Sequence, residues 1–139
     1  MDEKSLMSLA VEARKKAYAP YSGFRVGAAL LAASGKVYTG CNIENAAYTP
    51  TNCAERTAFF KAVSEGERAF VAIAVTGGGG EDPAPLCTPC GVCRQVMMEF
   101  CDRDFRVILG NNEEIRCVTL GELLPLSFSP KDLKGEDTP

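Results

Sequence analysis

The sequence predicts an α/β protein in which helices cover a five-stranded sheet. Apolar residues recur at helical spacing near the start, and five short apolar runs are separated by Gly- and Asn-containing turns. A strand–helix–strand order in the middle of the chain favours a layered sheet. The 139 residues suit a single domain over 1–139. Residues 129–139, rich in Lys, Asp, Pro and Gly, are expected to form a frayed tail.

The first half of the chain predicts a helix, a two-stranded hairpin and a second helix. The near-continuous apolar run 26–33 indicates a buried strand, and a Ser-Gly-Lys turn leads into a return strand over 37–43. A second helix is expected over 53–64, with Thr51 and Asn52 as candidate N-cap residues. The first helix is indicated by five apolar residues at helical spacing: Leu6, Leu9, Ala10, Ala13 and Ala17.

The second half predicts a strand over 70–75 and, after a Gly- and Pro-rich loop, a helix over 91–101. Strands over 105–109 and 115–120 flank a Gly-Asn-Asn turn, and 121–124 favours a short helix. Because a strand–helix–strand connection is normally a right-handed crossover, the strands before and after the 91–101 helix should be parallel.

Seven cysteines and no histidine restrict the chemistry. A Ser-His-Asp triad, a Cys-His nucleophile and imidazole metal ligands are excluded, so thiolates or carboxylates must hold any metal. An odd cysteine count and the absence of an apolar leader favour a cytoplasmic protein with reduced thiols. No apolar stretch is long enough for a membrane span. The net charge of −3 and pI of 5.0 argue against a nucleic-acid partner.

Three cysteines at two predicted helix starts form a candidate metal site. Cys90 and Cys93 have the C-x-x-C spacing that places two sulfurs on one side of a turn, and Cys53 offers a third thiolate. Three protein ligands leave the fourth tetrahedral position open, as in catalytic zinc sites. Glu55 is placed to move a proton, and Arg56 is expected to donate to the ligand sulfurs and offset their negative charge.

The remaining cysteines leave alternatives open. Cys87 extends the motif to C-x-x-C-x-x-C, which also occurs in iron–sulfur proteins, and it could complete a four-cysteine structural zinc site. Cys53, Cys90 and Cys93 could also form a purely structural zinc site with no catalytic role. We expect Cys87 to be a free or partly buried thiol. Cys41, Cys101 and Cys117 have apolar neighbours and are predicted to be small core residues.

Four segments together resemble one enzyme family. They are Tyr21-Ser22-Gly23-Phe24-Arg25-Val26-Gly27-Ala28-Ala29-Leu30, Asn42-Ile43-Glu44-Asn45-Ala46-Ala47-Tyr48, Cys53-Ala54-Glu55-Arg56-Thr57-Ala58 and Cys90-Gly91-Val92-Cys93-Arg94-Gln95. The chain is similar to the small homotetrameric zinc-dependent cytidine deaminases, from the first helix to Phe128. The resemblance implies a three-layer α-β-α fold with a mixed five-stranded sheet. It also implies a homotetramer whose sites are completed across subunits, with Phe128 a candidate to reach a neighbouring site.

The resemblance also assigns roles to the candidate residues. It implies one zinc per subunit on the three cysteines named above, with Glu55 as the catalytic proton shuttle. Asn42 and Glu44 would hold the sugar hydroxyls, Phe24 would lie against the pyrimidine ring, and the backbone amide of Ala54 would meet the base. From pattern alone Phe24 would be a core residue, and Asn42 and Glu44 would be solvated loop residues.

The implied activity is that of a hydrolase acting on the amidine C–N bond of a cyclic substrate. Cytidine and deoxycytidine would be deaminated to uridine and deoxyuridine with release of ammonia, a reaction of pyrimidine salvage. Two other interpretations stay open: a deaminase of another aminopyrimidine, such as a nucleoside antibiotic of the blasticidin type, and a non-catalytic zinc-binding interaction module.

Overall fold

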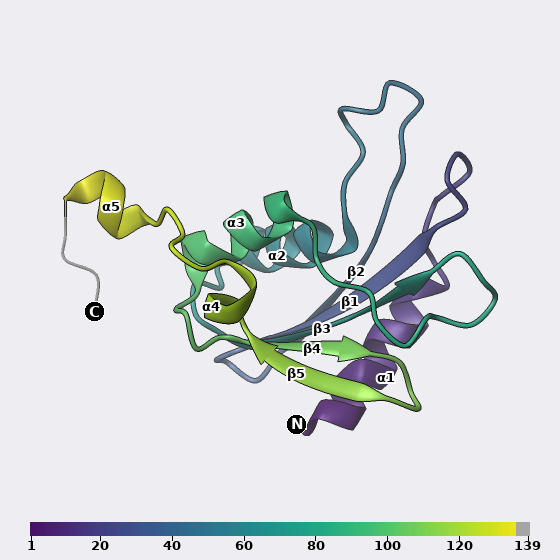
Figure 1. Cartoon of the computed structure of the whole chain (residues 1–139), viewed down its shortest axis with the longest axis horizontal. Helices are drawn as coiled ribbons and strands as arrows, with labels where there is room; N and C mark the ends of the chain where they lie inside the picture. Colours follow the sequence, from purple (N-terminus) through teal and green to yellow (C-terminus); the bar gives the residue numbers. More distant parts are fainter. Residues whose placement is uncertain (136–139) are drawn as a thin grey trace.

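A five-stranded sheet lies between two layers of helices in the computed structural model, which describes residues 1–135 (Figure 1). The strand order across the sheet is β2-β1-β3-β4-β5. The predicted three-layer α/β fold with five strands is therefore confirmed. The strands are β1 (Arg25–Ala32), β2 (Val37–Cys41), β3 (Phe70–Gly78), β4 (Arg106–Gly110) and β5 (Ile115–Thr119).

The sheet is mixed because its connections differ. β1 pairs antiparallel with both β2 and β3, and β4 pairs antiparallel with β5. β3 and β4 are parallel, with Ala72 opposite Arg106 and Val75 opposite Leu109. The helix α3 (Gly91–Phe100) connects these two strands, as the strand–helix–strand pattern predicts.

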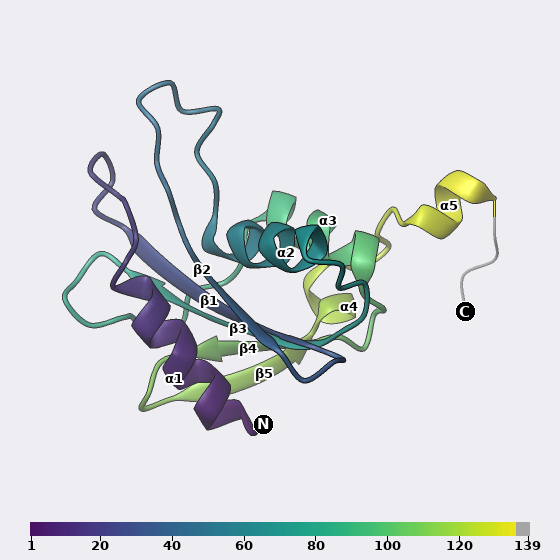
Figure 2. The same cartoon turned by 180° about the vertical axis from the view of Figure 1, so that it is seen from behind.

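Among residues 1–135, α1 (Glu3–Arg14) is the one helix that covers the first face of the sheet (Figure 2). The Asp2 side chain accepts from the Ser5 amide at 2.7 Å and caps the helix. Gly27 of β1 allows the helix to pack closely, because a Cβ at this position would lie 2.1 Å from the Ala10 carbonyl oxygen. This face is buried by Leu6, Met7, Ala10, Ala29, Leu31, Ala72, Ala74 and Ile108.

The opposite face packs against α2 (Ala54–Ser64), α3 and α4 (Leu120–Leu123). Phe59 lies at the centre of this core, with its ring centroid 5.0 Å from that of Phe70 and 6.1 Å from that of Phe100. Gly40 of β2 allows a close approach to α2, since a Cβ there would lie 2.5 Å from the Ala54 carbonyl oxygen. The contact holds the first turn of α2 against the sheet.

The C-terminal segment differs from the sequence prediction. A short helix, α5 (Pro130–Lys134), stands away from the layered body where a frayed tail was expected over 129–139 (Figures 1 and 2). Its start is stabilised because Ser129 and Asp132 form a capping box, with the Ser129 amide donating to Asp132 Oδ2 at 2.7 Å. The expectation is wrong for this helix, and residues 136–139 of the predicted tail lie outside the described residues.

Three local predictions are also wrong. Helix α2 has Cys53 as its N-cap rather than Thr51 or Asn52. Strand β3 continues to Gly78 because its last residues pair with the start of β1. Cys117 is exposed, not buried, because β5 is the edge strand of the sheet. Within residues 1–135, no helix combines the length and apolar character that crossing a membrane requires.

Candidate active site

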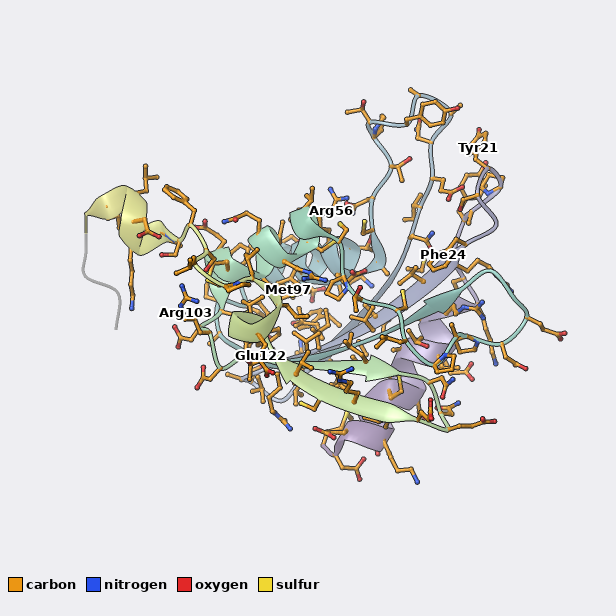
Figure 3. All side chains as sticks on the ribbon, in the orientation of Figure 1. Tyr21, Phe24, Arg56, Met97, Arg103 and Glu122 are labelled. Carbon is orange, nitrogen blue, oxygen red and sulfur yellow. The ribbon has the colours of Figure 1, made fainter. Side chains whose placement is uncertain are left out.

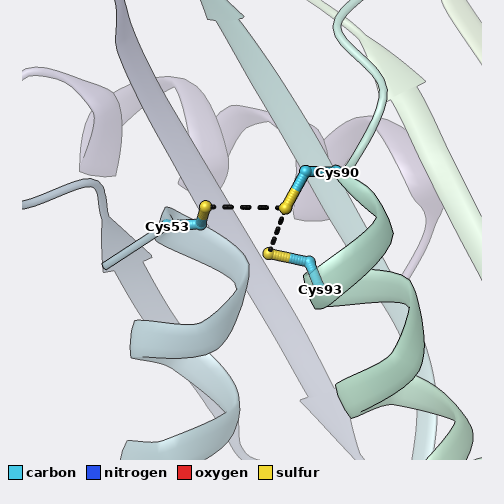
Figure 4. Close-up of side chains that lie close together, drawn as sticks. All are labelled: Cys53, Cys90 and Cys93. Atoms are coloured by element: carbon cyan, nitrogen blue, oxygen red, sulfur yellow. Dashed lines mark hydrogen bonds between the residues drawn. The ribbon is translucent and has the colours of Figure 1, made fainter. Parts of the chain in front are cut away.

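Three thiols meet where α2 and α3 begin (Figure 4). Cys53 and Cys90 are the N-cap residues of the two helices, and Cys93 lies in the first turn of α3. The Sγ atoms of Cys53 and Cys90 are 3.8 Å apart, and those of Cys90 and Cys93 are 3.5 Å apart. All three sulfurs lie within 4.8 Å of one another, so the structure brings the sequence-predicted ligands together.

The sulfur separations fit a tetrahedral zinc site. Zinc–sulfur bonds of about 2.3 Å at tetrahedral angles place ligand sulfurs roughly 3.8 Å apart. The three cysteines are free thiols, and their burial is graded from the buried Cys93 through Cys53 to the exposed Cys90. The cluster is therefore open toward solvent on one side, which leaves room for a fourth, exchangeable ligand.

Hydrogen bonds favour negative charge on the sulfur of Cys53. The pKa of the Cys53 thiol is lowered to about 5, chiefly because Cys93 donates a hydrogen bond to it and also because of Arg56. Arg56 Nη2 donates to Cys53 Sγ at 3.2 Å, which is the contact expected from the sequence. The N-terminal end of α2 adds a partial positive charge beside the same sulfur.

Glu55 is buried in the first turn of α2, with 4% of its surface exposed. Burial raises the pKa of its carboxyl to about 7, and the neighbouring charge of Cys53 acts in the same direction. Ala54, whose amide is implied to meet the base, is fully buried beside it. A carboxyl group and three thiols thus share one helix-start junction.

Cys87 does not join the three-sulfur cluster. Within residues 1–135, the group of potential ligands at this junction contains only the three cysteines of the two helix starts. The Cys87 thiol is half-buried, and a Cβ on Gly77 would lie 2.9 Å from its Sγ atom. Burial raises the pKa of this thiol to about 11, which keeps it protonated near neutral pH. The expected free, partly buried thiol is confirmed.

The residues implied to bind the sugar and the ring lie on two neighbouring loops. Phe24 directly precedes β1 and is 45% exposed, so the interpretation of Phe24 as a core residue is wrong (Figure 3). Asn42 follows β2; its Nδ2 donates to the Phe24 carbonyl and its Oδ1 accepts from the Val26 amide, both at 2.8 Å. Glu44 accepts from the Tyr21 amide at 2.9 Å.

Backbone pairing joins these loops to the cysteine cluster. Ile43 and Asn52 exchange two hydrogen bonds of 2.9 Å each, and Cys53 follows directly in the chain. Tyr18 pairs with Ile43 on its other side, which fixes the loop between α1 and β1 against the loop between β2 and α2. Asn42 and Glu44 flank Ile43, so both are held near the start of α2.

Two residues at this end of the molecule were missed by the sequence analysis. Ser22 donates its hydroxyl proton to the Glu44 carboxylate, and its position two residues before Phe24 in a Ser-Gly turn was the available signal. Arg14 is 3% exposed, although it lies on the apolar side of α1. It donates to four backbone carbonyls: those of Arg25, Gly78, Gly80 and Glu81.

Comparison with known proteins identifies the family. Residues 1–110 match the cytidine and deoxycytidylate deaminase zinc-binding region. The chain is 53% identical over 134 residues to the cytidine deaminase of Sporosarcina psychrophila, with 96% of each chain covered. It is 54% identical over 134 residues to that of Halalkalibacterium halodurans, covering 96% of this chain and 98% of the relative.

The fold comparison agrees with the sequence comparison. The crystal structure of the cytidine deaminase from Burkholderia pseudomallei superposes with a TM-score of 0.84 and 48% identity, covering 92% of this chain and all of that one. That of the Mycobacterium tuberculosis cytidine deaminase gives a TM-score of 0.77 at 37% identity, with 93% and 98% covered. The three-thiol cluster supplies ligands that suit the zinc-binding region matched by residues 1–110. The chain belongs to the family of cytidine and deoxycytidylate deaminases.

Proposed function

We propose that this chain catalyses the hydrolytic deamination of cytidine and deoxycytidine to uridine and deoxyuridine, releasing ammonia, as a step of pyrimidine salvage. The observation that carries the proposal is the buried carboxyl of Glu55 beside three thiols whose separations suit zinc. Family membership and the high identity to cytidine deaminases along nearly the whole chain support it.

Zinc would be held by Cys53, Cys90 and Cys93, and when bound it would supply Lewis acidity that makes a water molecule a better nucleophile at neutral pH. Glu55 would take a proton from the attacking water and deliver it to N3 of the base. The water oxygen would bond to carbon 4, and Glu55 would then carry the remaining hydroxyl proton to the exocyclic amine, so that the C–N bond breaks, ammonia leaves and a carbonyl stays at carbon 4. The amide of Ala54 would donate to the base and hold it beside Glu55.

Arg56 would moderate the charge of the thiolates. Three thiolates and one divalent zinc ion leave a net charge of about −1, which weakens Lewis acidity relative to a site with neutral imidazoles. The hydrogen bond from Arg56 to Cys53 withdraws electron density from one ligand sulfur. The guanidinium would therefore preserve the acidity that the attacking water needs.

Asn42 and Glu44 would bind the sugar hydroxyls, and the exposed ring of Phe24 would lie against the pyrimidine. An amide and a carboxylate supply both a donor and acceptors for hydroxyl groups. The negative charge of Glu44 would disfavour a 5′-phosphate, so a nucleoside is the proposed substrate rather than a nucleotide.

The proposed assembly is a cytoplasmic homotetramer of single-domain chains, with sites completed across subunits. Large apolar side chains are exposed around the site loops and before α5; Tyr48 is 78%, Leu126 99% and Phe128 60% exposed. Such exposure is typical of surfaces that are covered in an oligomer. Seven free thiols suit a reducing compartment.

The test combines a zinc assay with the loss of cytidine absorbance. The zinc-loaded protein should convert cytidine and deoxycytidine, and Glu55→Gln should retain zinc but lose about 10²–10⁴-fold in kcat. A folded, zinc-loaded protein that deaminates neither nucleoside would overturn the proposal. A panel of aminopyrimidine substrates distinguishes a cytidine deaminase from a deaminase of another aminopyrimidine. If the protein were instead a non-catalytic interaction module, Glu55→Gln would leave its binding to a partner unchanged.

A further inference from the structure

The Glu44 carboxylate is held by three donors from the loop between α1 and β1. Its Oε1 atom accepts from the Tyr21 amide at 2.9 Å and from the Ser22 amide at 3.1 Å. Its Oε2 atom accepts from the Ser22 hydroxyl. Two of the three hydrogen bonds therefore come from Ser22, and the only side-chain donor among them is its hydroxyl.

The number of acceptor positions on Glu44 limits what else it can bind. A carboxylate has about four lone-pair positions, two on each oxygen. Oε1 uses both of its positions on amides, and Oε2 uses one on the Ser22 hydroxyl. With the contacts of residues 1–135 counted, a single acceptor position on Oε2 is left for a ligand, so Glu44 can accept from one hydroxyl in a fixed orientation.

The Ser22 hydroxyl also connects Glu44 to Phe24. Its oxygen accepts from the Phe24 amide at 3.0 Å while its proton is donated to Glu44. The Phe24 carbonyl in turn accepts from Asn42 Nδ2 at 2.8 Å. Both backbone polar groups of Phe24 are therefore fixed by side chains of this network: the Ser22 hydroxyl joins Glu44 to Phe24, and the Phe24 carbonyl joins Asn42 to them. Figure 3 shows Tyr21 and Phe24 on this loop, beside the loop that follows β2.

We propose that Ser22 is a positioning residue that sets sugar selectivity, by orienting the one free acceptor position of Glu44 toward the 3′-hydroxyl of the nucleoside. The inference rests on the proposed function, whose two substrates share that hydroxyl and differ at the 2′ position. The Ser22 hydrogen bond is also the main reason that the pKa of Glu44 is lowered, which keeps the carboxylate ionised as an acceptor.

The chain supplies a matched control in Ser34. Its hydroxyl donates to Glu67 Oε2 at 2.6 Å and accepts from the Lys36 amide at 3.4 Å, which repeats the hydrogen-bonding pattern of Ser22. Ser34 lies in the turn between β1 and β2, at the end of these strands opposite to Phe24 and Asn42. Ser34→Ala therefore removes an equivalent serine–carboxylate contact away from the nucleoside residues.

The experiment compares deoxycytidine with 2′,3′-dideoxycytidine, which differs only in lacking the 3′-hydroxyl. Zinc-loaded Ser22→Ala should lose about tenfold in kcat/KM for deoxycytidine, mainly through KM, because a hydrogen-bonding partner of a charged group is removed. Its kcat/KM for dideoxycytidine should stay within about twofold of the parent. Ser22→Thr should restore the preference for deoxycytidine over dideoxycytidine, and Ser34→Ala should leave kcat/KM for both substrates unchanged.

Equal losses on both substrates, or no loss on either, would overturn the role of Ser22. Circular dichroism and zinc content report whether the Ser22→Ala variant folds. If that variant does not fold, Ser22→Thr, which keeps a hydroxyl, tests the role of this group. The dissociation constants of both nucleosides separate this inference from the proposed function. A parent that binds deoxycytidine without deaminating it contradicts the function alone, and the Ser22 effect is then measured on binding. A parent that binds neither nucleoside overturns both.

Discussion

Arg56 Nη2 donates a hydrogen bond to Cys53 Sγ at 3.2 Å, one helical turn after the cysteine in α2. The contact fixes the guanidinium on the surface of the three-thiol cluster. Within residues 1–135, the Nε atom of Arg56 is buried without a hydrogen-bond partner, and Nη2 makes the contact with Cys53.

Arg56→Gln should lower kcat or weaken zinc retention by about tenfold or more, because outer contacts to ligand atoms typically contribute 10–100-fold. The measurement is kcat at saturating cytidine, together with the rate of zinc loss to a chelator. Arg68→Gln is the control, since within the described part of the chain Arg68 donates to the Val63 and Glu67 carbonyls and to no thiol. Unchanged turnover and unchanged metal content would show that the guanidinium has no such role.

Cys87 and Cys90 should respond differently to substitution. Cys90→Ala removes one of three closely spaced sulfurs and should reduce zinc content well below one per chain. Cys87→Ala should retain one zinc per chain and remain colourless, because Cys87 lies outside the cluster. Metal analysis and a visible spectrum of each purified variant provide the readout. Loss of metal from Cys87→Ala would instead indicate a four-cysteine site.

Arg14→Met should destabilise the fold by about 2–4 kcal/mol, since the buried guanidinium donates to four backbone carbonyls that methionine leaves without a donor. These carbonyls belong to β1 and to the end of β3 with the loop that follows it. Urea unfolding of the zinc-loaded protein gives the change in free energy. Arg103→Met, on an exposed residue, is the comparison, and equal stability of the two variants would contradict the prediction.

The Glu67 carboxylate should contribute to stability in a pH-dependent way. Its pKa is lowered chiefly by the Ser34 hydroxyl and then by the Tyr38 hydroxyl, which donates at 2.9 Å. A carboxyl whose pKa is lower in the folded than in the unfolded state stabilises the fold at pH values above its pKa in the unfolded state. This stabilisation is lost as the pH falls through the pKa of the carboxyl in the folded state. The difference in urea midpoint between the parent and Glu67→Gln should therefore be largest near pH 7 and shrink below pH 4.5. A constant difference from pH 7 to about pH 3.5 would argue against this linkage.

The sequence was most informative where local spacing determines geometry. A C-x-x-C at a helix start constrains both sulfurs within one turn, and the apolar runs were long enough to place all five strands. The position of Cys53 beside that pair depends on how two helices pack on the sheet. Its place at a second predicted helix start offered it as a third thiolate, and the resemblance of the neighbouring motifs to a known family assigned it to the zinc.

The remaining differences arise from interactions between distant residues. Arg14 is buried because carbonyls more than sixty residues away accept from it, and no local pattern reports them. Cys117 has apolar neighbours in sequence but lies on the edge strand β5, which pairs with β4 on one side, and its thiol is exposed. Asn42 looks like a loop residue until its amide is seen to bridge the backbone at the start of β1.

The pairing of Ile43 with Asn52 has a consequence for how this enzyme tolerates change. Because two backbone hydrogen bonds clamp both ends of the intervening loop, its tip, including Tyr48, is mechanically separated from Asn42 on one side and Cys53 on the other. Lengthening such a tip adds only a small closure entropy. Changes at this tip should therefore alter the proposed contacts between subunits, through residues such as Tyr48, while Asn42 and Cys53 keep their backbone positions.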